Sequence, residues 1–478
     1  MSPEIQAALI AGIIGLVSLA GTVVVALRGF HATVQATSMA LDEAHRDAAD
    51  TLAVYRDQLD RTLAEQHVRT LNERFVTAVE KLGDDKQSAV QLAGIYAMGA
   101  LADEWASNRQ ACIGVLCGYL RMHNVLQAGS GEASLSFRAD REIRRTVVRM
   151  ITAHLRESAK VSWSDADLDF TGVVFDGGDF SQAHFSGGTV SFNGAQFSGG
   201  TVSFNGAQFS GGTVSFNGAQ FSGGTVDFSA AQFTAGAVYF NGAALTGSAV
   251  NFTVTQFSGG VVDFSAVEFA GSAVSFGFGK FSGSPVNFRN ARFSGSALNF
   301  VSAEFSDGTV YFNAAEFSGG TIYFTGASFS GGTVDFDYAK FSGGDIYFSV
   351  AEFCGGTVQF GDAEFSGGTL DFDNAEISGG TVNFGRTDQT SVGAGFSGGT
   401  INFGGTRFTG GKLDFTDTEF SGGSVSFEGA HFTGGTVDVG VVGEWTCPPQ
   451  FDWDAGAPPP AGVLLPAEAS EASSGPGT

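Results

Sequence analysis

The feature that most constrains this chain is a short phrase, FSGGTVSFNGAQ, which recurs with small variations from about residue 170 to residue 432. Within it the spacing between phenylalanines alternates between seven and five residues, as in Phe185, Phe192, Phe197, Phe204 and Phe209. A unit this short cannot bury its own apolar side chains, so it must stack on its neighbours along one axis. The repeat therefore predicts a long solenoid.

The side chains of each repeat are predicted to alternate between the core and the surface. Residues two apart in an extended segment share a face, so Ala195 and Phe197 point inward and Gln196 points outward. The inward phenylalanine hardly changes along the chain. The outward position varies freely, as at Asp227, Tyr239, Asp263, Glu304, Tyr311, Asp335, Glu352 and Asp371. With 47 Phe and 70 Gly among 478 residues, phenylalanine is expected to form the core and glycine the corners.

The start of the repeat region has a simpler spacing. In ADLDF-TGVVF-DGGDF-SQAHF, four phenylalanines follow one another at a strict interval of five, namely Phe170, Phe175, Phe180 and Phe185. Tandem units of the form A-x-F-x-G resemble the pentapeptide-repeat family, and the resemblance covers some 270 residues. It implies a right-handed, quadrilateral β-helix with one pentapeptide on each side and the central Leu or Phe inside.

The repeat departs from the family pattern by an extra dipeptide in alternate units. The departure predicts a turn of 24 residues in place of 20, with bulged corners on two opposite sides. About eleven turns spaced ~4.8 Å apart would give a rod of about 55 Å. Phe396 also follows Phe384 by twelve residues where five are expected, which indicates a seven-residue insertion at one corner. A tolerated insertion and a loop that contacts a partner both remain open.

The N-terminal region contains a candidate membrane anchor. Residues 5–27 form an uncharged run of 23 residues, long enough to cross a hydrocarbon core of about 30 Å. A signal peptide is disfavoured because a basic segment is lacking before the apolar run and the run is too long. Glu4 precedes the run and Arg28 follows it, so the positive-inside rule places the bulk of the protein in the cytoplasm.

The predicted organisation is a mixed fold. It comprises an N-terminal tip (1–4), a transmembrane helix (5–27), a juxtamembrane helix (28–82), a small all-α region (83–160), the pentapeptide-like β-helix (161–443) and a disordered tail (444–478). The heptads of the juxtamembrane helix are too broken to predict a coiled coil, so self-association is left open. The segments RFVTAVEKLG, CIGVLCGYLR and EIRRTVVRMITAHLR resemble the N-terminal region of membrane-anchored pentapeptide-repeat proteins of actinobacterial type.

Charge is divided unevenly along the chain. Residues 1–160 hold 17 Lys and Arg against 18 Asp and Glu, whereas residues 161–478 hold 7 against 31. The acidic rod disfavours direct binding of nucleic acid, which requires clustered basic residues. The basic run Arg141, Arg144, Arg145 and Arg149 is expected to form a solvated helix face, with lipid headgroups as the alternative contact.

No catalytic, cofactor-binding or metal site is predicted. Ser397 lies in a G-x-S-x-G sequence and is followed by Asp414 and His431, but it is the ordinary corner serine of every repeat and a strand follows it instead of a helix. The carboxylate pairs Asp335/Asp337 and Asp371/Asp373 have no ligand cage for Ca²⁺. The cysteines (Cys112, Cys117, Cys354 and Cys447) contain no CxxC motif, which favours a reducing compartment.

The sequence therefore favours a non-enzymatic scaffold, tethered to the cell membrane by a single span, whose acidic β-helix binds a protein partner. Two alternatives remain. Some soluble pentapeptide-repeat proteins imitate DNA and bind gyrase, so a DNA-mimicking rod for a basic nucleic-acid-binding protein is one. An extracellular adhesin or spacer rod is the other, and it applies if the membrane topology is reversed.

Overall fold

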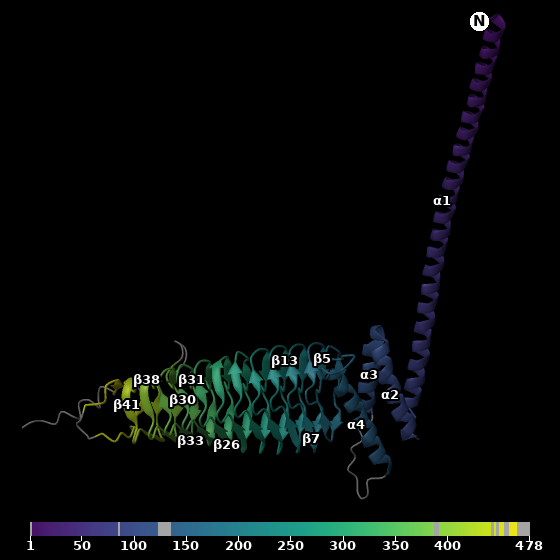
Figure 1. The fold of residues 1–478 in the computed structure, drawn as a ribbon. Helices are drawn as coiled ribbons and strands as arrows, with labels where there is room; N and C mark the ends of the chain where they lie inside the picture. Colours follow the sequence, from purple (N-terminus) through teal and green to yellow (C-terminus); the bar gives the residue numbers. More distant parts are fainter. Residues whose placement is uncertain are drawn as a thin grey trace, which may run out of the picture. The chain divides into compact units, whose positions relative to one another are not determined.

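In the computed structural model of the chain, the described residues are 2–84, 87–122, 135–386, 392–440, 444–445, 449–453 and 458–465. They fall into two compact units, with the boundary between Arg74 and Phe75. Each unit is described by itself below, and Figure 1 gives the order of the elements.

The first unit is formed by helix α1 (Pro3–Leu82), whose last two turns belong to the second unit. Every residue from 2 to 70 is exposed. The expected transmembrane segment (5–27) and juxtamembrane segment (28–82) are parts of this one continuous helix. Its most apolar window has a mean hydropathy of 2.5, so by length and composition it could cross a membrane.

The second unit begins with a small helical region made of α2 (Ser88–Glu104), a short 3-10 helix η1 (Ala106–Asn108), α3 (Arg109–Met122) and α4 (Leu135–Leu155). Its core is made of aliphatic side chains such as Ile95, Ile113, Leu116 and Ile151, each fully buried. The Met150 side chain of α4 lies against Gly99 of α2, where an added Cβ would lie 2.3 Å from the Met150 sulfur. Cys112 and Cys117 are buried in α3 as free thiols.

A parallel β-solenoid of about twelve turns follows the helices, one turn more than the sequence predicted. One typical turn contains β5 (Thr189–Ser191), β6 (Gln196–Phe197), β7 (Thr201–Ser203) and β8 (Gln208–Phe209). The next turn begins with β9 (Thr213–Ser215), and Val190 pairs with Val214. The pairing confirms a turn of 24 residues. The first turn, from β1 (Leu168–Asp169), is two residues shorter, since Leu168 pairs with Val190.

Among the described residues, the strands form two sheets of 22 and 21 strands, in which the paired strands are parallel. In the typical turn β5 and β8 belong to one sheet, and β6 and β7 belong to the other. Each sheet bends around an SGG corner, and some strands, such as β26 (Glu316–Tyr323), pass through that corner without a break. We name the four sides after the inward residue of the typical turn: the Phe192, Phe197, Phe204 and Phe209 faces.

Four columns of inward phenylalanines fill the solenoid. Within a column the rings stack on one another, as with Phe192 and Phe216, whose centroids are 4.7 Å apart at 3°. Across the core the Phe192 and Phe204 columns meet edge to face, at 5.9 Å and 87°. Both arrangements are favoured by the ring quadrupole. The prediction that phenylalanine points inward is confirmed, since both Phe192 and Phe204 have no exposed surface.

The paired glycines are required where each sheet bends. Gly212 has a φ of 68°, and a Cβ there would lie 2.4 Å from the carbonyl oxygen of Gly188 in the preceding turn. A side chain would therefore separate the two turns, which explains why SGG recurs while the outward positions vary.

The helical region covers the first turn of the solenoid. Arg121 pairs with Asp169 at 2.6 Å, and Arg156 pairs with Asp179 at 2.9 Å. From the predicted basic run, Arg141 pairs with Asp176, and Arg144 donates to the carbonyl oxygen of Val174 at 2.6 Å. The expectation of a solvated or lipid-facing basic helix is therefore wrong for Arg144, which is part-buried against the open end of the solenoid, whereas Arg141 stays exposed while it pairs with Asp176.

The last turn is covered by residues from the segment predicted to be a disordered tail (444–478). Phe451 stacks on Phe427 at 4.8 Å, and Trp453 stacks on Phe451 at 4.0 Å. Strand β43 (Val463–Leu464) pairs with β41 (His431–Asp438). Residues 446–448, 454–457 and 466–478, with Cys447 among them, lie outside the described residues.

Candidate functional site

The Phe197 face carries a ladder of alternating charges. Parallel, in-register strands place the same position of each turn directly beside its counterpart in the next turn. The outward residue before the inward Phe therefore forms a column. Successive turns place Glu268 on β18 (Glu268–Ala270), Arg292 on β22 (Arg292–Ser294), Glu316 on β26, Lys340 on β29 (Lys340–Tyr347) and Glu364 on β32 (Glu364–Phe365).

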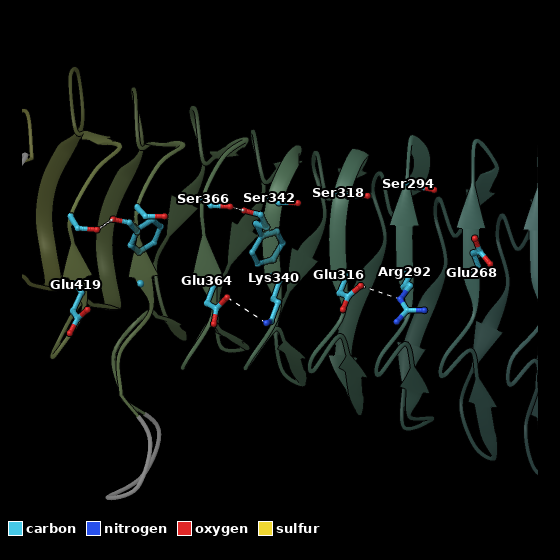
Figure 2. A pocket seen from close by; sticks show the side chains of 15 residues that line it. Glu268, Arg292, Ser294, Glu316, Ser318, Lys340, Ser342, Glu364, Ser366 and Glu419 are labelled. Carbon is cyan, nitrogen blue, oxygen red and sulfur yellow. Dashed lines mark hydrogen bonds and ion pairs between the residues drawn. The ribbon is translucent and has the colours of Figure 1, made fainter.

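Neighbouring charges of this ladder form exposed ion pairs (Figure 2). Arg292 Nε lies 3.1 Å from Glu316 Oε2, and Lys340 Nζ lies 3.7 Å from Glu364 Oε2. All four side chains are more than half exposed, so each pair contributes only about 0–1 kcal/mol to folding. The alternation avoids the repulsion that like charges would feel in adjacent strands.

A long open groove of about 570 Å³ runs along the ladder. Figure 2 shows a row of corner serines beside the row of charged side chains. The serine hydroxyls donate to main-chain carbonyl oxygens of the preceding turn, as in Ser318 to Phe293 at 3.3 Å and Ser366 to Phe341 at 3.3 Å. The groove thus has one polar wall whose hydroxyls are already bonded and one charged wall that faces solvent.

The ladder is interrupted at Gly395. This residue lies on β36 (Gly395–Phe396), between Glu364 and Glu419 of β39 (Glu419–Phe420). The alternation would place a basic residue here, but a glycine leaves the position empty. A Cβ at Gly395 would meet no atom within 4 Å, so the space above it is open. We call the opening flanked by Glu364 and Glu419 the Gly395 notch.

A smaller ladder lies on the Phe209 face. Lys280 Nζ pairs with Glu304 Oε2 at 3.1 Å, and Arg407 pairs with Glu376. Both pairs join consecutive turns, as on the Phe197 face. Four of the seven basic residues of the rod therefore lie in these two ladders, namely Lys280, Arg292, Lys340 and, on β38 (Arg407–Asp414), Arg407.

The family assignment follows from the repeat and its register. A family model described as "Pentapeptide repeats (9 copies)" matches residues 170–213, the first two turns of the solenoid. Their inward residues include Phe170, Phe175, Phe180 and Phe185, the run with strict spacing of five. The chain is a pentapeptide-repeat β-solenoid protein. No curated protein and no solved structure matches it. The likeness to membrane-anchored proteins of actinobacterial type stays a prediction.

The pentapeptide-repeat solenoid separates Ser397 of the G-x-S-x-G pattern from His431, the candidate base. The Ser397 hydroxyl donates to the carbonyl oxygen of Phe365 at 3.5 Å. Burial alone would raise the pKa of the Asp414 carboxyl, but hydrogen bonds from Lys412 and Thr416 outweigh it and hold that pKa below its ordinary value. His431 lies on the Phe209 face beside Arg407. Ser397 lies on the other sheet, so these residues form no nucleophile–base pair.

The carboxylate pairs of the pentapeptide-repeat solenoid accept hydrogen bonds at its corners. Asp335 Oδ1 accepts from the Asp337 amide at 3.0 Å, and Asp371 Oδ1 accepts from the Asp373 amide at 3.1 Å. Asn402 of the next turn also donates to Asp371 at 2.8 Å. Among the described residues, no group of three or more His, Cys, Asp or Glu is placed to hold a metal ion.

The insertion is attached to the turns on either side. Phe365 pairs with Phe396, a separation of 31 residues instead of 24, which confirms seven additional residues. Val392 donates to Asp362 Oδ1 at 2.9 Å, and Arg386 pairs with Asp417 at 2.6 Å. Residues 387–391 lie outside the described part of the chain.

Sequence reasoning identified the outward positions but missed the ladder and its notch. The available signal was the residue before every fourth inward phenylalanine, read at intervals of 24. That reading gives Glu268, Arg292, Glu316, Lys340 and Glu364, and then Gly395 once the insertion is removed.

Proposed function

We propose that this protein is a non-enzymatic scaffold, tethered to the cell membrane by residues 5–27, whose right-handed, quadrilateral solenoid lies in the cytoplasm and binds a basic protein partner. The observation that carries the proposal is the groove on the Phe197 face with its interrupted charge ladder. The groove is long and open, and extends from Glu268 to Glu419. A shape of this kind suits a polypeptide segment better than a small molecule, which prefers an enclosed pocket.

The charge of the site favours a basic segment. Residues 161–478 carry 24 more acidic than basic residues, which attracts a cationic partner over a distance. At close range the Gly395 notch offers space between two carboxylates. A lysine or arginine side chain of the partner would fill that space and restore the alternation.

The hydrogen bonds that the groove's serine hydroxyls already make favour a scaffold over an enzyme. The serines that line it donate to main-chain carbonyl oxygens, including Ser397. No described histidine lines the groove. A hydroxyl that donates to a main-chain carbonyl oxygen, and not to a base, is a weak nucleophile, so binding is the function that this arrangement supports.

A DNA mimic is less well supported. Imitation of a phosphate backbone needs an unbroken row of negative charges. On the Phe197 face Arg292 and Lys340 interrupt the carboxylates, and on the Phe204 face Asn251 and Asn402 follow Asp227 and Asp371. We therefore expect supercoiling by gyrase to be unaffected by micromolar protein, and inhibition in that assay would favour the mimic instead.

The notch provides the test of binding. The probe is a fluorescent, lysine-rich helical peptide, titrated into the full chain in detergent and followed by anisotropy. Gly395→Lys fills the notch and should weaken binding about tenfold, because a bound lysine would lose its site and meet a like charge. The control, Gln208→Lys, adds the same charge at an exposed position of the Phe209 face and should change the affinity less than about twofold. Equal losses in the two variants, or no binding of the peptide at all, would contradict a specific groove.

A further inference from the structure

Helix α1 carries an apolar stripe beyond the predicted membrane segment. Its large side chains are exposed, with exposed fractions from 47% to 67%, at Phe30, Val34, Leu41, Leu52, Tyr55, Leu59 and Leu63. Residues 2–70 include no buried position, so no described part of the chain covers this stripe. The first buried residue of the helix is Leu71, beyond the end of the stripe.

The stripe is straight and free of charge. At about 100° per residue, these seven side chains fall within a sector about 80° wide, over a length of about 50 Å. Leu41, Leu52 and Leu63 are spaced by eleven residues, a period close to three helical turns that keeps a stripe on one side of a helix. No Asp, Glu, Lys or Arg lies inside the sector between residues 30 and 63. Over the same residues, the opposite side carries charged residues, including an ion pair of Asp57 with Arg61 at 2.8 Å, and only two large apolar side chains, Met39 and Val54.

We infer that this stripe binds the same stripe of a second copy of the chain, in a parallel and in-register pair of helices. The inference rests on the membrane anchor of the proposed function. Helix α1 continues from residues 5–27 into the stripe without a break. Two copies inserted in one membrane therefore have the same direction, and their stripes begin at the same height.

The composition of the stripe fits identical partners in register. Thr37 and Gln66 lie in the same sector as the leucines. When identical helices pair in register, each polar residue meets its own copy and can form a hydrogen bond, whereas a shifted register would place it against a leucine. Polar residues of this kind fix the register of paired helices at some cost in stability.

Pairing would give the scaffold two solenoids at one place on the membrane. Two linked binding faces raise the effective concentration of the second contact, so a partner with two basic segments would be held more tightly than either segment alone. The stripe thus supplies a reason for the 55-residue helix between the predicted anchor and the small helical region, residues 28–82.

Disulfide trapping in membranes tests the pair. The full chain carries Cys354→Ser and Cys447→Ser, while Cys112 and Cys117 stay buried in α3. Single cysteines are placed on the stripe (Leu52→Cys, Leu59→Cys, Leu63→Cys) and, as matched controls, on the opposite side (Asp50→Cys, Asp57→Cys, Arg61→Cys). With a mild oxidant, we expect the stripe positions to form covalent dimers at least ten times faster than the controls.

The outcomes separate this inference from the anchor. Equal rates on both sides, or no dimer at any position, would overturn the pairing, and a different protein or the lipid surface would then cover the stripe. Dimers at a single stripe position alone would indicate antiparallel crossing and would overturn the parallel register. Carbonate extraction of the same membranes reports the anchor independently. As a second variant, Leu52→Glu combined with Leu59→Glu should convert the dimer to a monomer by light scattering in detergent.

Discussion

At the scale of single residues, this solenoid stacks identical side chains on one another in its core and mostly avoids doing so with charged side chains on its surface. Each position lies beside its counterpart one turn away, which favours phenylalanine inside and penalises repeated charge outside. The chain alternates Arg or Lys with Glu on the Phe197 face. On the Phe204 face it places an amide beside a carboxylate, as where Asn251 donates to Asp227 at 3.2 Å. Glycine at 395 is the exception that opens the notch.

The core columns are predicted to be sensitive to truncation. Phe288 is fully buried and stacks at 4.9 Å on both Phe264 and Phe312. Phe288→Ala should lower the free energy of unfolding by about 3–5 kcal/mol, because the cavity lies between two turns that cannot close it. The exposed control Gln256→Ala should stay within about 0.5 kcal/mol. Urea unfolding followed by circular dichroism measures both, and similar midpoints would contradict a stacked core.

One corner stores backbone strain that the sequence did not reveal. Val254 has a φ of 62°, a conformation that a β-branched residue rarely adopts, and the same corner two turns earlier is Gly206. Val254→Gly should raise the free energy of unfolding by about 0.5–1 kcal/mol, the relief of strain less the entropy of glycine. The reverse change, Gly206→Val, should lower it by a similar amount, about 0.5–1 kcal/mol. A loss of stability in Val254→Gly would show that the corner is not strained.

At the scale of elements, the inward and outward pattern could be predicted because one residue type recurs in one register. The inward orientation of Phe192, Phe197 and Phe204 could be predicted from their spacing alone. The arginine contacts could not be predicted in the same way, since Arg141 and Arg144 looked like an exposed basic face until the open end of the solenoid lay against them. Val254 escaped prediction for a related reason. The turns on either side impose its conformation, and its own propensity opposes it.

The junction between helices and solenoid should be sensitive to acid. Burial alone would raise the pKa of the Asp169 and Asp179 carboxyls, but hydrogen bonds and the nearby Arg121 and Arg156 lower both pKa values. A lowered pKa in the folded state contributes stability that is fully present above the ordinary carboxyl value of about 4 and is lost as the pH falls through the lowered value.

The double variant Asp169→Asn, Asp179→Asn should remove that part of the pH dependence. We expect its first-turn amides, such as that of Phe170, which donates to Ser191 at 2.7 Å, to exchange hydrogen at rates that change less between pH 5 and pH 3 than in the wild-type protein, after correction for intrinsic exchange. Glu352→Gln, at an exposed position in the middle of the rod, is the control and should keep the wild-type pH dependence. If the double variant behaves like the control, groups other than Asp169 and Asp179 cause the acid sensitivity.

At the scale of the whole molecule, function depends on the side of the membrane that the solenoid occupies. The fold is the same in either orientation, and the charges next to residues 5–27 are few. A cytoplasmic rod binds internal partners through its groove, whereas a reversed rod would act as an adhesin or spacer. One native thiol can distinguish them, because Cys354 is exposed on the solenoid and free.

We expect Cys354 to react with a membrane-impermeant maleimide only after cells are permeabilised. The variant carries Cys447→Ser, and Cys117 stays silent because burial raises the pKa of its thiol to about 12. A second variant with Ser2→Cys and Cys354→Ser reports the other end of α1 and should react in intact cells. Reaction of Cys354 alone in intact cells would show that the topology is the reverse of the proposed one and would favour the extracellular adhesin or spacer rod. If neither thiol reacts until permeabilisation, α1 does not cross the membrane, and the tether must then lie on the inner surface or be absent.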